Sequence, residues 1–303
     1  MPQIPSVNKV RRRLYFPLRQ YLLKPKFSGA KLKHFLGQDL YFSLLAYPKL
    51  GYWPDIKNPR TFNEHILYRQ VYTNDPRFAV VEGKLSARDI VEDRIGDSVL
   101  PKLHFQTTNP EEIPFDELPQ SFVVKPTHGS GGDVLLIEDK TNWSKPDIIR
   151  KCKKWMDPRV NRANGQYWYE EIKQMILIEE YLGGGDSPPR DFKFYVFHGQ
   201  SEYIHVDFDR FYEPKRRFFD REWAPQEFRK GGVPLGPAID RPTRFEEMRD
   251  VAESLGSDFD FIRVDIYQLD DDQVVFGEFT VGPAHGRSPF SPSEYDYTLG
   301  ELW

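Results

Sequence analysis

The fold is set by two apolar runs near the C-terminus, Phe261-Ile-Arg-Val-Asp-Ile-Tyr267 and Val274-Val-Phe-Gly-Glu-Phe-Thr280. Both are rich in β-branched and aromatic residues, which favours strands. The acidic turn Asp270-Asp-Asp272 lies between them. The two runs therefore predict a β-hairpin.

Side chains repeat with a period of two along a strand, so Arg263 shares a face with Asp265, and Glu278 shares one with Thr280. If the two strands pair, Asp265 and Glu278 can converge. Two carboxylates together with phosphate oxygens and waters suit Mg²⁺. Arg263 beside them would stabilise charge on a phosphate. An ordinary Arg–Asp pair on a sheet is the alternative interpretation.

Upstream, Lys125-Pro-Thr-His-Gly-Ser-Gly-Gly-Asp133 joins two short strand-like runs, Ser121–Lys125 and Val134–Ile137. Glycines let the backbone approach phosphate oxygens, and consecutive N–H groups can form an anion-binding nest. No Gly-Lys-Ser/Thr closes the loop, so it is not a Walker loop. Either a phosphate loop or a tight turn fits this pattern. The candidate nucleotide contacts are Lys125, His128, Gly129, Ser130, Gly131 and Gly132.

The apolar run that starts at Gln174 ends in Glu179-Glu-Tyr-Leu182. A strand end of this kind can offer backbone groups to adenine, and a carboxylate can take the amino group or ribose hydroxyls. The candidates are Glu179, Glu180, Tyr181 and Leu182. Two charges at a strand end are also common on ordinary surfaces.

Elsewhere the pattern predicts helices over 63–72, 77–95, 145–155 and 244–255, with Thr61 or Asn63 as the cap of the first and Gly96 closing the second. Further strands are expected over 191–197 and 203–208, and residues 106–118 are expected to form a surface connection. Helices and strands mixed in this way indicate the α+β class.

Composition describes an ordinary globular chain of 303 residues, with 39% hydrophobic and 29% charged residues. A net charge of −4 argues against bulk nucleic-acid binding. One cysteine, no apolar run of membrane length and no signal-like start predict a cytoplasmic protein. Residues 1–35 are basic with interleaved apolar residues, which fits either a solvated helix or contact with an anionic membrane or polysaccharide.

Three signals in this order resemble the ATP-grasp fold, and more narrowly the TupA-like ATP-grasp family of polysaccharide and teichuronopeptide biosynthesis. The matching stretches are Asn58-Pro-Arg-Thr-Phe-Asn-Glu64, Lys84-Leu-Ser-Ala-Arg88, Phe122–Gly132, Ile178–Leu182, Asp191–Gly199, Asp207-Phe-Asp-Arg210, Phe261–Tyr267 and Phe276–Thr280. The resemblance implies two α/β subdomains that sandwich ATP. The sequence departs from the common ATP-grasp pattern at two positions. Thr280 stands where many ATP-grasp enzymes have Asn, and Gly83 stands where Asp often precedes the lysine that corresponds to Lys84.

The resemblance also implies residue roles. Lys125 would contact the α- and β-phosphates, and the loop Gly129 to Gly132 would close over the triphosphate. Glu179 to Leu182 would form the adenine hinge, with Asp191 a candidate for ribose. Lys193, Arg210 and Arg263 would face phosphates or an acyl phosphate, and Asp265, Glu278 and Thr280 would hold magnesium.

The implied domains are a basic, mostly helical region 1–80, a connection 81–118, a lid subdomain 119–185 and a C-terminal subdomain 186–303 with the metal site. The implied activity is a ligase that uses ATP and Mg²⁺ to join a carboxylate, such as a uronic acid on a glycan, to an amine or amino acid. A sugar or small-molecule kinase on the same fold and a non-catalytic glycan-binding protein are the alternatives. For Arg216, Arg217 and Arg221, contact with an acidic sugar and a solvated loop both remain open.

Overall fold

The computed structural model describes residues 29–128, 133–157, 166–183, 189–208, 213–270 and 272–303, with the side chains of 29–32 left out. Its helices are α2 Gly29–Leu36, α3 Gln38–Leu50, α4 Phe62–Tyr72, α5 Arg77–Glu82, α6 Lys84–Arg94, α7 Lys145–Trp155, α8 Phe245–Gly256 and α9 Glu294–Gly300. Short 3₁₀ turns are η1 Asp97–Val99, η2 Pro110–Glu112, η3 Lys140–Asn142, η4 Tyr167–Glu170 and η5 Pro283–Gly286.

The strands form two main sheets and one short pair. The smaller sheet has the order β1-β4-β2-β3, from β1 Leu103–Thr107, β2 Phe122–Pro126, β3 Leu135–Ile137 and β4 Ile176–Glu180. The larger sheet has the order β11-β10-β5-β6-β7-β8, from β5 Arg190–Phe197, β6 Gln200–Phe208, β7 Lys215–Asp220, β8 Pro225–Gln226, β10 Phe261–Gln268 and β11 Val274–Thr280. The third sheet pairs β9 Arg229–Lys230 with β12 Phe290–Ser291.

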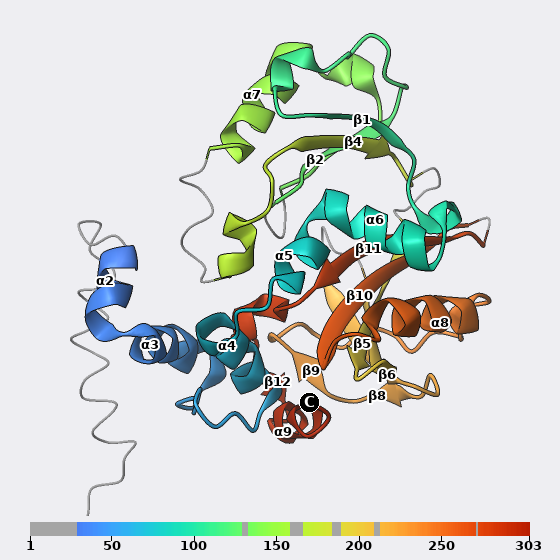
Figure 1. Ribbon diagram of the computed structural model, residues 1–303. Coiled ribbons are helices and arrows are strands. Elements are labelled where there is room, and N and C mark those ends of the chain that lie inside the picture. Colours follow the sequence, from blue (N-terminus) through green and yellow to red (C-terminus); the bar gives the residue numbers. More distant parts are fainter. Residues whose placement is uncertain (1–28, 129–132, 158–165, 184–188, 209–212, 271) are drawn as a thin grey trace, which may run out of the picture.

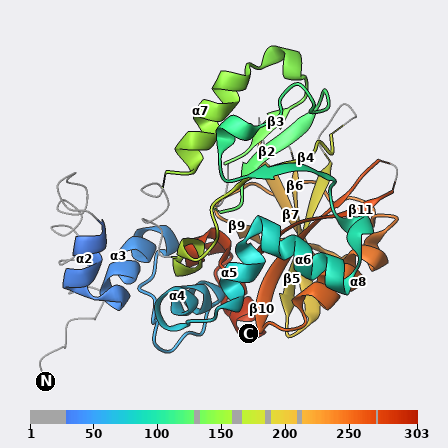
Figure 2. The ribbon, with the colours of Figure 1, turned by 45° about the horizontal axis from the view of Figure 1, so that its top comes forward.

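Each main sheet has its own core. Helix α7 covers the smaller sheet, and Ile148 and Cys152 on that helix are buried against Phe122 and Ile178. Helix α8 covers the larger sheet, and α5 and α6 lie beside β11 between the two sheets, as Figures 1 and 2 show. The α+β prediction is confirmed by this arrangement.

Helix α4 joins the N-terminal region to the larger sheet. Thr61 caps it: the Thr61 hydroxyl accepts from the Glu64 amide at 3.1 Å, and the Glu64 carboxylate accepts from the Thr61 amide at 3.1 Å. This reciprocal pair satisfies two amides that a helix start leaves open. The prediction of this helix and its cap is confirmed.

Two sequence predictions are wrong. The expected helix 77–95 is two helices, because Gly83 has an extended backbone with φ −73° and ψ 110°. The expected surface connection 106–118 includes the end of β1, which pairs with β4, and its Ile113 and Leu118 are buried in the smaller core. Our division into four ranges stays a prediction, and it leaves β1 outside the subdomain whose sheet it joins.

None of the helices in the described ranges is both long and apolar enough to cross a membrane.

Candidate active site

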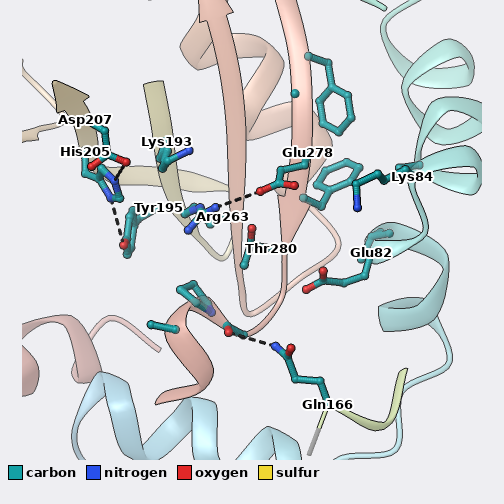
Figure 3. Close-up of a pocket in the computed structure, with 18 of the residues that line it drawn as sticks. Glu82, Lys84, Gln166, Lys193, Tyr195, His205, Asp207, Arg263, Glu278 and Thr280 are labelled. Carbon is teal, nitrogen blue, oxygen red and sulfur yellow. Dashed lines mark hydrogen bonds and ion pairs between the residues drawn. The ribbon is translucent and has the colours of Figure 1, made fainter. Parts of the chain in front are cut away.

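A cavity of about 360 Å³ lies between the two sheets. The smaller sheet contributes Lys125 and Glu179, and the larger sheet contributes Lys193, Arg263 and Glu278. Figure 3 shows labelled residues of the larger sheet, among them Arg263 and Glu278, pointing into the cavity, with Glu82 and Lys84 opposite them. Basic and acidic side chains from distant parts of the sequence therefore meet in one place.

A β-bulge decides which way Glu278 points. In β11, Phe276 pairs with Ile266 and Glu278 pairs with Asp265, so Gly277 is an extra residue with no partner of its own. In a strand that alternated regularly, Glu278 would share the face of the buried Phe276. The extra residue instead returns Phe279 to the core and turns Glu278 toward the cavity.

Only glycine fits this bulge without adjustment. A Cβ at Gly277 would meet the Asp265 carbonyl oxygen at 3.0 Å and the Tyr267 ring at 2.9 Å. Glycine at position 277 thus lets the backbones of β10 and β11 approach closely.

Charged residues form a row across neighbouring strands. Glu278 on β11 lies opposite Asp265 on β10, and Asp265 lies opposite Lys193 on β5. The predicted pairing of the hairpin, with Asp265 and Glu278 brought together, is confirmed. In the next row Thr280 lies opposite Arg263.

Asp265 is a buried carboxylate with two cationic partners. Arg263 donates from Nε and Nη2 to its two oxygens at 2.6 and 2.7 Å, and Lys193 Nζ donates at 2.6 Å. Burial would raise the pKa of Asp265, but Arg263 and Lys193 hold it below its ordinary value. Burial lowers the pKa of Lys193, yet Asp265 and Asp191 leave it raised. All three groups are therefore charged.

Glu278 differs from Asp265 in exposure. Its side chain is 48% exposed and its contact with Arg263 Nη2 is long, at 3.5 Å. Magnesium is seldom enclosed by protein alone and takes one or two carboxylates together with phosphate oxygens. Within the described ranges no cluster of three His, Cys, Asp or Glu side chains suits a metal. Glu278 and Thr280 line the cavity and fit an ion that is shared with a phosphate. Asp265 is not part of the lining and has both oxygens bonded to Arg263 and Lys193, so its role as a metal ligand stays a prediction.

On the smaller sheet, Glu179 is buried between two cations. It forms ion pairs with Lys125 and with Arg88, the latter at 3.1 Å. Glu180, in contrast, is exposed and accepts from the Lys102 amide at 3.2 Å. Tyr181 donates to Glu138 at 3.2 Å, and neither Tyr181 nor Leu182 lines the cavity. The adenine-hinge role of these four residues stays a prediction.

His128 and Asp191 lie away from the cavity lining. His128 is 1% exposed, and its Nε2 lies 3.1 Å from the Trp155 carbonyl oxygen. Asp191 pairs with Lys193 from the side away from Arg263. Gly129, Ser130, Gly131, Gly132 and Arg210 lie outside the described residues, so their roles stay predictions.

Several residues of the cavity were given no site role from the sequence, although Lys84, Arg88 and Asp207 stand in stretches that carry the family resemblance. Lys84 and Arg88 line the cavity from α6, and Tyr195, His205, Asp207 and Lys230 line it from four other positions on the larger sheet and its neighbour β9. The alternation of side chains along a strand does indicate Tyr195 and Asp207. Tyr195 shares a strand face with the candidate Lys193 two residues before it, and Asp207 shares one with His205. Lys230 has no such local signal.

The arginines around β7 differ in their contacts. Arg216 pairs with Asp207 at 2.7 Å and lines the cavity. Arg217 pairs with Glu227 at 2.8 Å, and Arg221 pairs with Glu253 at 2.5 Å. Of the three, Arg216 is the one placed to meet a molecule in the cavity.

The buried carboxyl group of Glu82 should make the stability of the protein depend on pH. The side chain accepts from the Tyr169 hydroxyl at 2.6 Å and the Val281 amide at 2.7 Å, but burial outweighs both and raises its pKa to about 7 from 4.5. Because the folded-state pKa is the higher one, stability is fully present below pH 4.5 and falls as pH rises to 7, by roughly 3 kcal/mol.

The variant Glu82→Gln should remove that fall, as measured by urea unfolding at a series of pH values. Glu92→Gln, an exposed carboxylate on α6, is the matched control and should leave the wild-type pH profile in place. An unchanged profile in Glu82→Gln would show that this carboxyl is not the source.

Two sheets that face each other across a cavity of lysine, arginine and carboxylate side chains define the ATP-grasp class of proteins. The chain belongs to the TupA-like ATP-grasp family, because the family model described as TupA-like ATPgrasp matches residues 64–303. The resemblance seen in the sequence and the expected fold are thereby confirmed.

Solved structures of ligases are similar at low identity. The ATP-grasp ligase PsnB with its minimal precursor is 15% identical over 71% of this chain and 58% of its own, with a TM-score of 0.41. The D-alanine–D-alanine ligase from Bacillus anthracis is 17% identical over 74% and 67%, with a TM-score of 0.45. The VanG D-Ala:D-Ser ligase from Enterococcus faecalis is 14% identical over 69% and 55%, with a TM-score of 0.42. A comparison with curated protein sequences found no match.

Proposed function

We propose that this protein is an ATP- and Mg²⁺-dependent carboxylate–amine ligase. The observation that carries the proposal is the charged row of the larger sheet: Glu278 and Lys193 line the cavity on either side of the buried Asp265 and face Lys125 of the other sheet. Phosphoryl transfer needs alignment and neutralised charge more than covalent help from protein, and this row supplies both.

The chemistry divides among the residues of the chain. Lys125 would hold the α- and β-phosphates, with Glu179 fixing its position through their ion pair. Lys193 and Arg263 would neutralise the γ-phosphate, and Asp265 keeps both cations in place. Magnesium, when bound at Asp265, Glu278 and Thr280, would neutralise phosphate charge. A carboxylate oxygen of the substrate would then attack the γ-phosphorus, and ADP would leave.

The second half-reaction would form the amide. The resulting acyl phosphate reacts with an amine, the C–N bond forms, and phosphate leaves with the bonding electrons of the C–O bond. Family resemblance supports a uronic acid or a peptide on a surface polysaccharide as the carboxylate, and an amino acid or other amine as the partner.

The deciding experiment is incubation of the protein with ATP, Mg²⁺ and a panel of uronic-acid glycans and amines. We expect ADP release that requires both partners, together with a gain in product mass equal to the amine minus water. A phosphorylated product formed without any amine would instead identify a kinase.

Lys125→Met should weaken binding of ATP by about 10- to 100-fold, because a charge-assisted contact to phosphate is lost. Isothermal titration with a non-hydrolysable ATP analogue measures this. Lys140→Met is the control, since Lys140 follows the next strand and contacts backbone oxygens at Phe115, Asp116 and Leu118. Equal affinities in both variants would contradict the role of Lys125.

We also infer that the protein works in the cytoplasm at the inner face of the membrane, which the basic residues of 1–35 support. Most of this segment lies outside the described residues. Removal of residues 1–35 should abolish sedimentation with vesicles that contain anionic lipid. Full sedimentation of the shortened chain would dismiss this inference.

A further inference from the structure

Lys230 on β9 is a buried amine at one end of the cavity. The residue is 2% exposed and lines the cavity. Within the ranges that the structure describes, its Nζ donates to the Tyr195 hydroxyl at 3.2 Å and makes no ion pair. The same nitrogen lies over the rings of Phe62, Tyr195 and Phe290 at 4.6, 5.1 and 5.1 Å.

The carboxylates near this end already have partners. Asp207 accepts from Arg216 at 2.7 Å and lies 3.2 Å from His205. Asp296 is the carboxylate that attracts Lys230 electrostatically. It already accepts hydrogen bonds from the Asn63 backbone amide at 3.0 Å and from the Tyr52 hydroxyl at 2.9 Å. Lys230 therefore lacks a counter-charge from these neighbours.

The other charged groups that face Lys230 are cations. Burial first, and then the charges of Arg216 on β7 and Arg263 on β10, lower the pKa of Lys230 well below its ordinary value, while Asp296 on α9 acts in the opposite direction. The two remaining elements around it, α4 and β12, contribute the rings of Phe62 and Phe290. The rings favour a charged ammonium, whereas burial and the two arginines disfavour it, so a bound anion is what would balance the charge of Lys230.

Lys230 also lies to one side of the Lys193–Asp265 pair. Along β5, Lys193 is opposite Asp265, and Tyr195 is opposite Arg263, two residues further on. Two residues of a strand span about 7 Å. Tyr195, to which Lys230 donates, is thus one step past Lys193 and Asp265, in the same row as Arg263.

We infer that this end of the cavity binds the carboxylate of the amine substrate, so that the substrate is an amino acid and not a simple amine. The inference rests on the proposed ligase function. Lys230 supplies the charge and the Tyr195 hydroxyl a second donor. Because the pKa of Tyr195 is raised to about 12 by burial, its hydroxyl stays protonated at neutral pH.

Isothermal titration of the full chain saturated with MgADP tests the inference. The probes are glycine, alanine and glutamate, each beside its α-amide, which has the same amine but no α-carboxylate. At least one acid should bind about 10- to 100-fold more tightly than its amide. Lys230→Met should remove that difference and Lys230→Arg, which keeps the charge, should retain most of it. Lys215→Met on β7, with a side chain 46% exposed, is the control and should behave as wild type.

Proton uptake provides a second readout. A bound carboxylate raises the pKa of Lys230, so the amine takes up protons to the extent that it was neutral before binding. Titrations at pH 8 in buffers of different ionisation enthalpy should show uptake in the wild type and none in Lys230→Arg, where the guanidinium is always charged.

Equal affinities for every acid and its amide would overturn the inference, as would an acid preference that survives in Lys230→Met. If Lys230→Met fails to fold, the wild-type comparison and Lys230→Arg still decide the matter. Failure to bind MgADP would refute the ligase proposal instead, so the two failures are distinct.

Discussion

Asp265→Asn should destabilise the protein by about 3 kcal/mol, because the substitution leaves Arg263 and Lys193 as buried cations without their shared carboxylate. Urea unfolding measures this loss. The same variant should bind a nucleotide–Mg²⁺ complex more weakly, but that effect alone would not separate the metal from the fold.

The variant Glu278→Gln separates the effect on metal binding from the effect on folding. Its side chain is half exposed and its ion pair is long, so its stability should stay within about 0.5 kcal/mol of wild type. The Mg²⁺-dependent gain in affinity for ADP should nevertheless fall about tenfold or more, as titration with and without the metal would show. Glu111→Gln, an exposed carboxylate that pairs with Lys153, is the control. A full Mg²⁺ effect in Glu278→Gln would rule out this metal site.

Arg69→Met should cost about 3–5 kcal/mol, the largest stability effect we expect at a position outside the cavity. Arg69 on α4 donates to the carbonyl oxygens of Val281 at 2.9 Å and Phe261 at 2.8 Å. Its guanidinium also lies 4.3 Å from the centre of the Trp303 ring. Methionine would fill the space but leave two buried carbonyl groups without a donor.

Thermal and urea unfolding measure the cost at Arg69. Arg60→Met is the matched control, because Arg60 is an exposed arginine just before the same helix. Its effect should stay within about 0.5 kcal/mol. A loss below 1 kcal/mol in Arg69→Met would mean that the helix is held to the hairpin by its apolar contacts alone.

The sequence allowed the hairpin and its pairing to be predicted because alternation is local. Arg263 and Asp265 are two residues apart, and the turn that joins the strands is short. The bulge at Gly277 could not be read in this way, since it appears only when the partner strand fixes the register. The prediction therefore paired Asp265 with Glu278 correctly but did not include the bulge that brings Glu278 to the same face as Asp265.

Residues that meet through tertiary packing were beyond prediction. Lys230 belongs to a two-residue strand, and the aromatic rings around its amine come from α4, β5 and β12. Lys84 reaches the cavity because the chain breaks at Gly83, where helical periodicity had suggested one continuous helix. The Lys84 amide then donates to the Thr127 carbonyl oxygen at 3.1 Å and ties the second helix to the smaller sheet.

The unpaired glycine of β11 constrains how genes for such proteins can change. The loop between Gln268 and Val274 can gain or lose residues, because the pairing on either side of it is unaffected. Gly277 is a second place where the length can change: without it, Phe276 would still lie opposite Ile266 and Glu278 opposite Asp265, so the strand would alternate regularly and no side chain would change face. Reading-frame-preserving variation in this hairpin should therefore concentrate at its tip and at Gly277.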